Sequence, residues 1–124
     1  MEIKVGTLAC ISHEFKDVLG NKPGTIGVCY EVYKIRERGT ARPGYAFIFP
    51  NGSYNSFSLD NVREMLCVIG DTNFRYRFLS FMELENNFRA GQFDWLKQLP
   101  VLSYSETIPG IKLSELFGRL EFEF

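Results

Sequence analysis

The sequence predicts an α+β fold, with a five-stranded β-barrel over residues 1–70 and a helical extension packed on it over residues 71–124. Three observations predict this arrangement. Five short runs rich in β-branched and aromatic residues are separated by glycine, proline and asparagine. A single helix-start signal precedes the fifth run. After residue 71 the apolar residues change from the spacing of a strand to that of a helix.

The first two strands are predicted over residues 2–12 and 24–36. Residues 2–12 alternate in a way that points Val5, Ala9 and Ile11 inward. The breakers of LGNKPG follow, and then the run GTIGVCYEVYKIR predicts a long strand that is bent or bulged near Gly27. The next residues, ERGTARPG, are polar and predict a connection between strands.

The next two strands form a predicted hairpin around Asn51 and Gly52, because Asn-Gly between apolar runs is a strong hairpin signal. The strand before the turn, YAFIFP, divides its apolar side chains between two faces. One face carries Tyr45, Phe47 and Phe49, and the other carries Ala46 and Ile48.

A short helix is predicted between the fourth and fifth strands. Ser58 is placed to cap it, and Leu59, Val62 and Leu66 have helical spacing for one or two turns. The run LCVIG then resumes as the fifth strand.

The extension is predicted to hold two helices. Ser80 and Glu83 form a capping box before an apolar stripe that contains Phe81, Leu84 and Phe88. The second helix, FDWLKQL, is apolar on more than one side, so it is either buried against the barrel or in contact with another molecule. We therefore take Phe93 and Trp95 as candidate partner-binding residues.

The last residues alternate strictly, which predicts a terminal strand. Leu120, Phe122 and Phe124 share one side and Glu121 and Glu123 the other. This strand can pair with an edge of its own barrel or with the same edge in a second copy, which would make a homodimer. Phe122 and Phe124 are therefore further candidate partner-binding residues.

Composition and motifs argue against catalysis. The charge is −1, from 14 basic and 15 acidic residues, while aromatic residues make up 15% of the chain. The chain has one histidine, His13, and no recognisable nucleophile elbow, and its three cysteines are far apart in apolar runs without CxxC spacing. We expect no enzymatic activity, no cofactor and no metal. The charged N-terminus and the lack of a long apolar run predict a cytoplasmic protein without a membrane partner.

The segment from Lys34 to Arg42 is the candidate ligand-binding loop. Lys34, Arg36, Arg38 and Arg42 are basic there against a single acid, Glu37. With Tyr33, Tyr45 and Tyr54 nearby, the loop could offer cations beside stacking surfaces to a phosphate-bearing or single-stranded ligand. The alternative is a solvated loop that only maintains solubility.

The leading KVG, the run PGTIGVCYEV, the hairpin YAFIFPNGSY and the helical turn into CVIG resemble the SH3-like barrels of the KOW and Tudor type. The resemblance covers residues 3–70. It implies binding of nucleic acid or protein, as in KOW barrels, or of methylated side chains in an aromatic cage, as in Tudor barrels. The near-neutral charge departs from both.

Our first functional hypothesis is a non-catalytic interaction module that binds a protein partner or itself. Size and architecture suit the accessory proteins of phages and mobile elements, including inhibitors of bacterial defence. The alternatives are a KOW-like protein that binds nucleic acid through the loop from Lys34 to Arg42, and a protein that binds a nucleotide or small molecule between barrel and helices.

Overall fold

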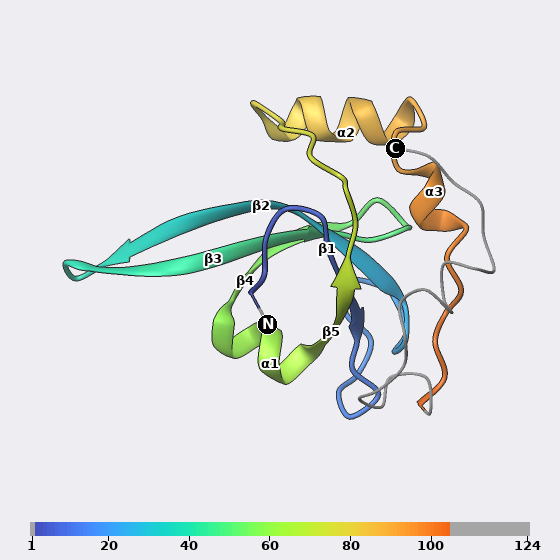
Figure 1. Cartoon of the computed structure of the whole chain (residues 1–124), viewed down its shortest axis with the longest axis horizontal. Coiled ribbons are helices and arrows are strands. Elements are labelled where there is room, and N and C mark those ends of the chain that lie inside the picture. Colours follow the sequence, from blue (N-terminus) through green and yellow to red (C-terminus); the bar gives the residue numbers. More distant parts are fainter. Residues whose placement is uncertain (1, 105–124) are drawn as a thin grey trace.

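The computed structural model describes residues 2–104, which form a five-stranded antiparallel sheet followed by helices (Figure 1). The elements in chain order are β1 (Thr7–Ile11), β2 (Ile26–Glu37), β3 (Thr40–Ile48), β4 (Tyr54–Ser58), α1 (Leu59–Met65), β5 (Leu66–Asp71), α2 (Phe81–Arg89) and α3 (Asp94–Lys97). The predicted α+β class and the five strands are confirmed. The predicted terminal strand, with Phe122 and Phe124, lies outside the described residues.

The strands are ordered β4-β3-β2-β1-β5, so the sheet is open and has β4 and β5 as its edges. The pairing that would close the predicted barrel is absent from residues 2–104. The short helix α1 joins the two edge strands. Its start is fixed as predicted, because Ser58 Oγ accepts a hydrogen bond from the backbone N–H of Asn61 at 3.2 Å.

Over β1 and the adjoining parts of β2 and β3 the sheet is buried on both faces, so the residues there form nearly continuous apolar runs. All five residues of β1 are buried, and so are the last five of β3. One face forms the first core with α1. The first core contains Ile3, Ala9, Ile11, Val18, Cys29, Tyr45, Phe47, Phe49, Phe57, Val62 and Leu66.

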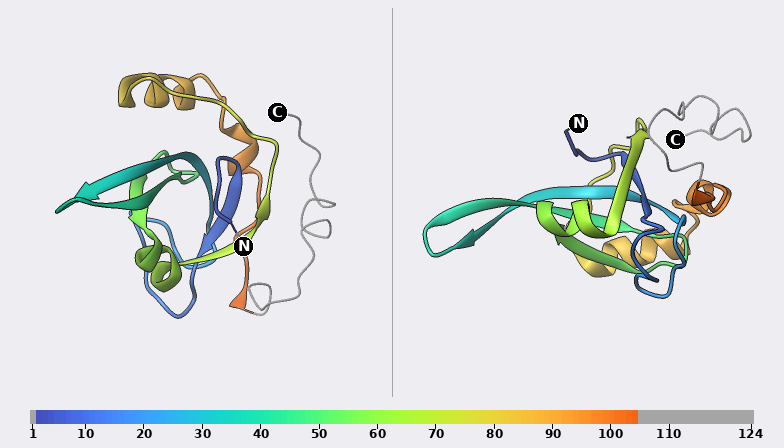
Figure 2. Two further views of the ribbon diagram at one scale, coloured as in Figure 1. Left: turned by 60° about the vertical axis from the view of Figure 1, so that its left-hand side comes forward. Right: turned by 90° about the horizontal axis from the view of Figure 1, so that it is seen from below.

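The second core lies on the opposite face, where the sheet is covered by residues of the extension (Figure 2). The sheet contributes Leu8, Cys10, Ile26, Val28, Tyr30, Ala46 and Ile48, and the extension contributes Phe74, Leu84, Phe93, Trp95, Leu96, Leu99 and Leu102. Val5 packs against this second core, whereas the sequence predicts it on the face of Ala9 and Ile11.

The Asn-Gly hairpin is confirmed. The backbone N–H of Phe49 donates to Ser53 O at 2.9 Å, and that of Gly52 donates to Phe49 O at 2.9 Å. Gly52 has φ +86°, a conformation that favours glycine. The irregularity in β2 lies at Tyr30 and not at the predicted Gly27, since the register with β3 shifts between Cys29 and Glu31.

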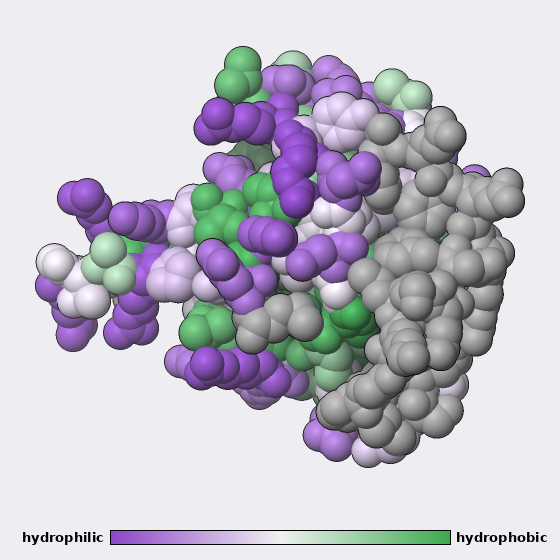
Figure 3. Space-filling model, viewed as in Figure 1, coloured by the Kyte–Doolittle hydropathy of each residue, from purple (hydrophilic) through white to green (hydrophobic). Residues whose placement is uncertain are grey.

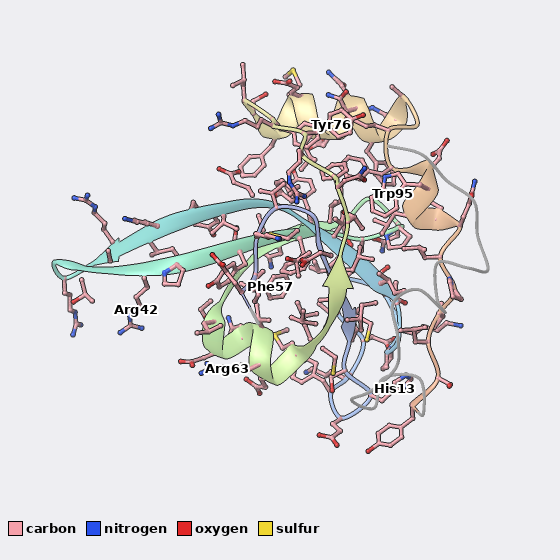
Figure 4. The ribbon with its side chains drawn as sticks, viewed as in Figure 1. His13, Arg42, Phe57, Arg63, Tyr76 and Trp95 are labelled. Atoms are coloured by element: carbon pink, nitrogen blue, oxygen red, sulfur yellow. The ribbon has the colours of Figure 1, made fainter. Side chains whose placement is uncertain are left out.

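The described chain ends beside the connection between β1 and β2. The backbone N–H of Leu102 donates to Gly24 O at 2.9 Å. Leu102 O in turn lies 2.8 Å from Nε2 of His13, which is labelled in Figure 4. These contacts hold the last part of the extension across the end of the sheet.

Within residues 2–104, none of the helices combines the length and the apolar character that a membrane crossing requires.

Candidate interaction surfaces

The predicted basic loop is not a loop, because residues 31–44 continue β2 and β3 as a two-stranded ribbon that we call the arm. Its register pairs Lys34 with Pro43, Ile35 with Arg42 and Arg36 with Ala41. The arm projects from the rest of the molecule in Figures 1 and 2. The sequence predicts the strand only as far as Arg36 and takes the polar residues after it as a connection, whereas the structure extends β2 to Glu37 and begins β3 at Thr40.

The tip of the arm is a tight turn. Glu37 pairs with Thr40, so only Arg38 and Gly39 lie between the strands. Both have positive φ, 50° at Arg38 and 79° at Gly39, as the two-residue turn with positive φ at both central positions requires. The turn therefore presents the Arg38 side chain at the far end of the arm.

The arm carries a positive charge on an otherwise acidic chain. Its four cationic residues against Glu31 and Glu37 give a net charge of +2. Because the whole chain has −1, the other 110 residues carry −3. The side chains of Lys34, Arg36, Arg38 and Arg42 are exposed, and no ion pair within residues 2–104 involves them.

The four cations do not form one cluster. Side chains alternate along a strand and residues opposite each other share a face. Lys34 and Arg36 are therefore on one face of the arm with Pro43 and Ala41, whereas Arg42 is on the other face with Ile35. Figure 4 shows Arg42 on the arm, well away from the two cores. The arm thus presents cations on both faces and at its tip.

Of the three candidate tyrosines, only Tyr33 is part of the arm. Its ring covers Gly44, where a β-carbon would lie 2.6 Å from the Tyr33 ring carbon Cζ. Tyr45 is buried in the first core. Tyr54 faces α2, where its hydroxyl donates to Glu85 Oε1 at 2.7 Å and its ring stacks on Phe81 at 5.4 Å. The structure therefore brings only Tyr33 near the cations, on the face of the arm that carries Arg42, and separates Tyr45 and Tyr54 from them.

Phe93 and Trp95 are not on the surface. Phe93 is fully buried and Trp95 is 7% exposed, and both rings pack against Phe74 in the second core. Figure 4 shows Trp95 beside α3. The helix is apolar on more than one side because it is buried within this chain. Phe93 and Trp95 are therefore unavailable to a partner.

A surface that the sequence did not predict lies at the start of α2. Leu79 is 92% exposed, Met82 71% and Phe81 65%. We call these three residues the apolar cluster. Figure 3 shows hydrophobic atoms at this end of α2, at the top of the view. Tyr76, which Figure 4 labels, is also exposed, and its ring lies 5.0 Å from that of Phe74.

A capping box and the burial of Leu84 together determine how α2 presents the apolar cluster. Ser80 Oγ accepts from the backbone N–H of Glu83 at 3.1 Å, and Glu83 Oε2 accepts from that of Leu79 at 3.0 Å. The cap fixes where α2 begins, and the packing of Leu84 in the second core then leaves the three residues of the apolar cluster on the surface. Leu79 precedes the cap and Met82 falls beside the inward stripe, so helical periodicity alone gives no signal for them.

Two of the reactive side chains among the described residues are buried cysteine thiols. No group of three His, Cys, Asp or Glu side chains in residues 2–104 lies together in a way that could hold a metal ion. Burial raises the pKa of the Cys10 and Cys29 thiols to about 12. Both thiols are therefore protonated at neutral pH, which makes them poor nucleophiles.

Comparison of this chain with protein-family models, with curated proteins and with solved structures gives no match.

Proposed function

We propose that this protein is a non-catalytic interaction module that binds a protein partner through the apolar cluster. The observation that carries the proposal is the exposure of Leu79, Phe81 and Met82 together at one helix start. Single exposed apolar residues are ordinary, but adjacent ones form the kind of surface that protein partners bury. The resemblance of residues 3–70 to SH3-like barrels, which serve many binding proteins, is consistent with this role.

The cluster is also ordered before any partner arrives. The backbone N–H of Leu79 is bonded to Glu83, and Phe81 is stacked on Tyr54. Burying a large apolar side chain contributes about 1.5–3 kcal/mol. Since the backbone around Leu79 is already held in place, less of that contribution is offset by ordering on binding.

The test replaces Leu79 and Met82 by glutamate and leaves Phe81 in place, because the Phe81 ring packs on Tyr54. A matched control replaces Val101, which is 45% exposed outside the cluster, by glutamate. Affinity capture from cell extract with quantitative mass spectrometry should recover a protein with the wild type and V101E that L79E/M82E does not retain. Recovery of the same proteins by all three would contradict the proposal.

Self-association is measured separately by light scattering. If the partner is a second copy, the wild-type mass should exceed that of a monomer and fall to the monomer value in L79E/M82E. A monomeric wild type excludes a second copy as the partner.

The charge of the arm favours a second candidate function, which is binding of nucleic acid. A two-stranded ribbon fits the major groove of DNA, and exposed lysines and arginines contact phosphates. The arm has both properties, and the acidic remainder of the chain would direct nucleic acid toward it. The resemblance to KOW barrels is consistent with this function.

Fluorescence anisotropy with single- and double-stranded DNA and RNA over a range of salt concentrations tests this candidate. Replacing Arg36, Arg38 and Arg42 by alanine should weaken binding. The slope of the logarithm of the binding constant against the logarithm of the salt concentration should become less negative by about 0.7–0.9 for each phosphate that the arm no longer neutralises. The charge-matched control replaces Lys16, Lys22 and Arg63, which are exposed outside the arm. Equal losses of affinity in both variants would show only a general effect of charge.

A further inference from the structure

Cys10 and Cys67, which are 57 positions apart in the sequence, lie directly opposite each other in the sheet. Cys10 is in β1 and pairs with Cys67 in β5. Opposite residues of antiparallel strands project from the same face. Both side chains accordingly belong to the second core, Cys10 as a member and Cys67 packed against it.

The Cys10 and Cys67 side chains are within hydrogen-bonding reach of each other, and this contact adds to burial, the largest cause, in raising the pKa of Cys10. The Cα spacing of the two strands also falls in the range of disulfides. The backbone N–H of Ser12 donates to Met65 O at 2.9 Å, and hydrogen-bonded pairs recur every second residue along an antiparallel ladder. Cys10 and Cys67 are two residues further along, so their Cα atoms are about 5.5 Å apart. Disulfide-bonded cysteines most often have Cα atoms about 5.5–6 Å apart.

The two thiols differ in access to solvent. Cys10 is fully buried, whereas Cys67 is only partly buried. Cys67 is therefore the thiol that a reagent in solution reaches first. Burial is the largest cause that raises the pKa of the Cys10 thiol, and the neighbouring Cys67 is the next. Because the thiolate is the reactive form, Cys10 reacts more readily as the pH rises.

Cys29 provides an internal comparison. It is as buried as Cys10, but it lies in the first core on the opposite face and pairs with Phe47. A reaction that depends only on the presence of a cysteine would not distinguish Cys29 from Cys10. A reaction that depends on the cross-strand pair would exclude Cys29.

We propose that Cys10 and Cys67 are a redox-active pair that closes to a cross-strand disulfide when the protein meets a small-molecule disulfide such as oxidised glutathione. The Cys67 thiolate attacks one sulfur of oxidised glutathione, forms a mixed disulfide and releases one glutathione thiolate. The Cys10 thiolate then attacks Cys67 Sγ and releases the second. The two cysteines lose two electrons and two protons, and one oxidised glutathione becomes two reduced ones.

The disulfide would join an edge strand covalently to the centre of the sheet. Among the described strands, β5 pairs only with β1. A bond between Cys10 and Cys67 would prevent β5 from separating, and it would also close the loop of chain that contains β2, β3, β4 and α1. Oxidation should therefore raise the melting temperature, and reduction should reverse the change.

The test incubates the full chain with excess oxidised glutathione at mildly alkaline pH, followed by intact-mass measurement and non-reducing peptide mapping. We expect the loss of two hydrogen atoms without a retained glutathione, and a peptide that links Cys10 to Cys67. C29S should behave as the wild type, C67S should form no disulfide, and C10S should stop with glutathione on Cys67. Dithiothreitol should restore the original mass and melting temperature.

Three results would overturn the proposal: a lasting glutathione adduct on Cys67 in the wild type, a disulfide that includes Cys29, or an unchanged mass. The wild type and C29S suffice for this decision if C10S or C67S does not fold.

Discussion

The carbonyl oxygen of Leu102 lies against Gly24, at a place where no β-carbon fits. A β-carbon at residue 24 would overlap this oxygen, and Gly24 has φ +89°. The two residues are also joined by the hydrogen bond from the Leu102 N–H to Gly24 O. The glycine thus allows the extension to approach the connection between β1 and β2 closely.

Replacing Gly24 by alanine should lower the free energy of unfolding by about 2–4 kcal/mol, because strain at positive φ adds to the overlap with Leu102. The measurement is urea denaturation followed by circular dichroism. Gly39→Ala is the control, since Gly39 has φ +79° but no atom within 4 Å of its added β-carbon. Its loss of stability should be only about 1 kcal/mol. Equal losses in the two variants would show that the overlap with Leu102 has no effect.

Replacing Gly52 by valine should lower the free energy of unfolding by about 1–3 kcal/mol, since a branched residue is strained at positive φ. The added β-carbon would also lie 3.0 Å from the Phe88 ring of α2. The change should therefore loosen α2 as well as the hairpin. Hydrogen exchange of the backbone amides in α2 measures this second effect, and unchanged exchange in α2 would contradict it.

Replacing Arg36, Arg38 and Arg42 by alanine should leave the free energy of unfolding within about 0.5 kcal/mol of the wild type. These side chains are exposed and lie outside both cores. Thermal denaturation checks this prediction independently of any ligand. A large loss of stability would mean that these arginines stabilise the fold. A binding defect in the same variant could then not be attributed to lost contacts with the ligand.

Stability should fall in alkaline solution partly because of Tyr30. Burial is the largest cause that raises the pKa of this phenol, followed by Glu31 and Tyr54. A raised pKa in the folded state gives stability that is fully present below the unfolded pKa of about 10 and is lost as the pH rises further. Tyr30→Phe should therefore flatten the decline in unfolding free energy above about pH 10. Parallel curves for both proteins would contradict this role.

The elements that the sequence predicts well have local causes. The hairpin at Asn51 and Gly52 depends on a positive φ, which only a few residues accept, and the caps at Ser58 and Ser80 depend on side chains that bond to nearby backbone. The faces of Phe47 and Ile48 follow from the two-residue period of a strand.

The candidate surfaces depend on contacts between distant residues, so the sequence predicts them less well. The arm is polar and contains Pro43 and Gly44, and only its cross-strand register shows that it is a ribbon. In the sequence, Phe93 and Trp95 have the properties of interface residues, because nothing in it indicates that Phe74 packs against both of them. The exposure of Leu79 and Met82 depends on the orientation in which α2 packs against the sheet.

The second core also determines when the protein can finish folding during its synthesis. The ribosome delivers all five strands by Asp71, but most of the large side chains with which the extension covers Leu8, Val28 and Ile48 lie beyond Leu84. A nascent chain that has emerged from the ribosome only as far as residue 80 therefore has one sheet face without its cover. At about 5–20 residues per second this interval lasts seconds, during which a bare apolar face is open to chaperones or to neighbouring nascent chains.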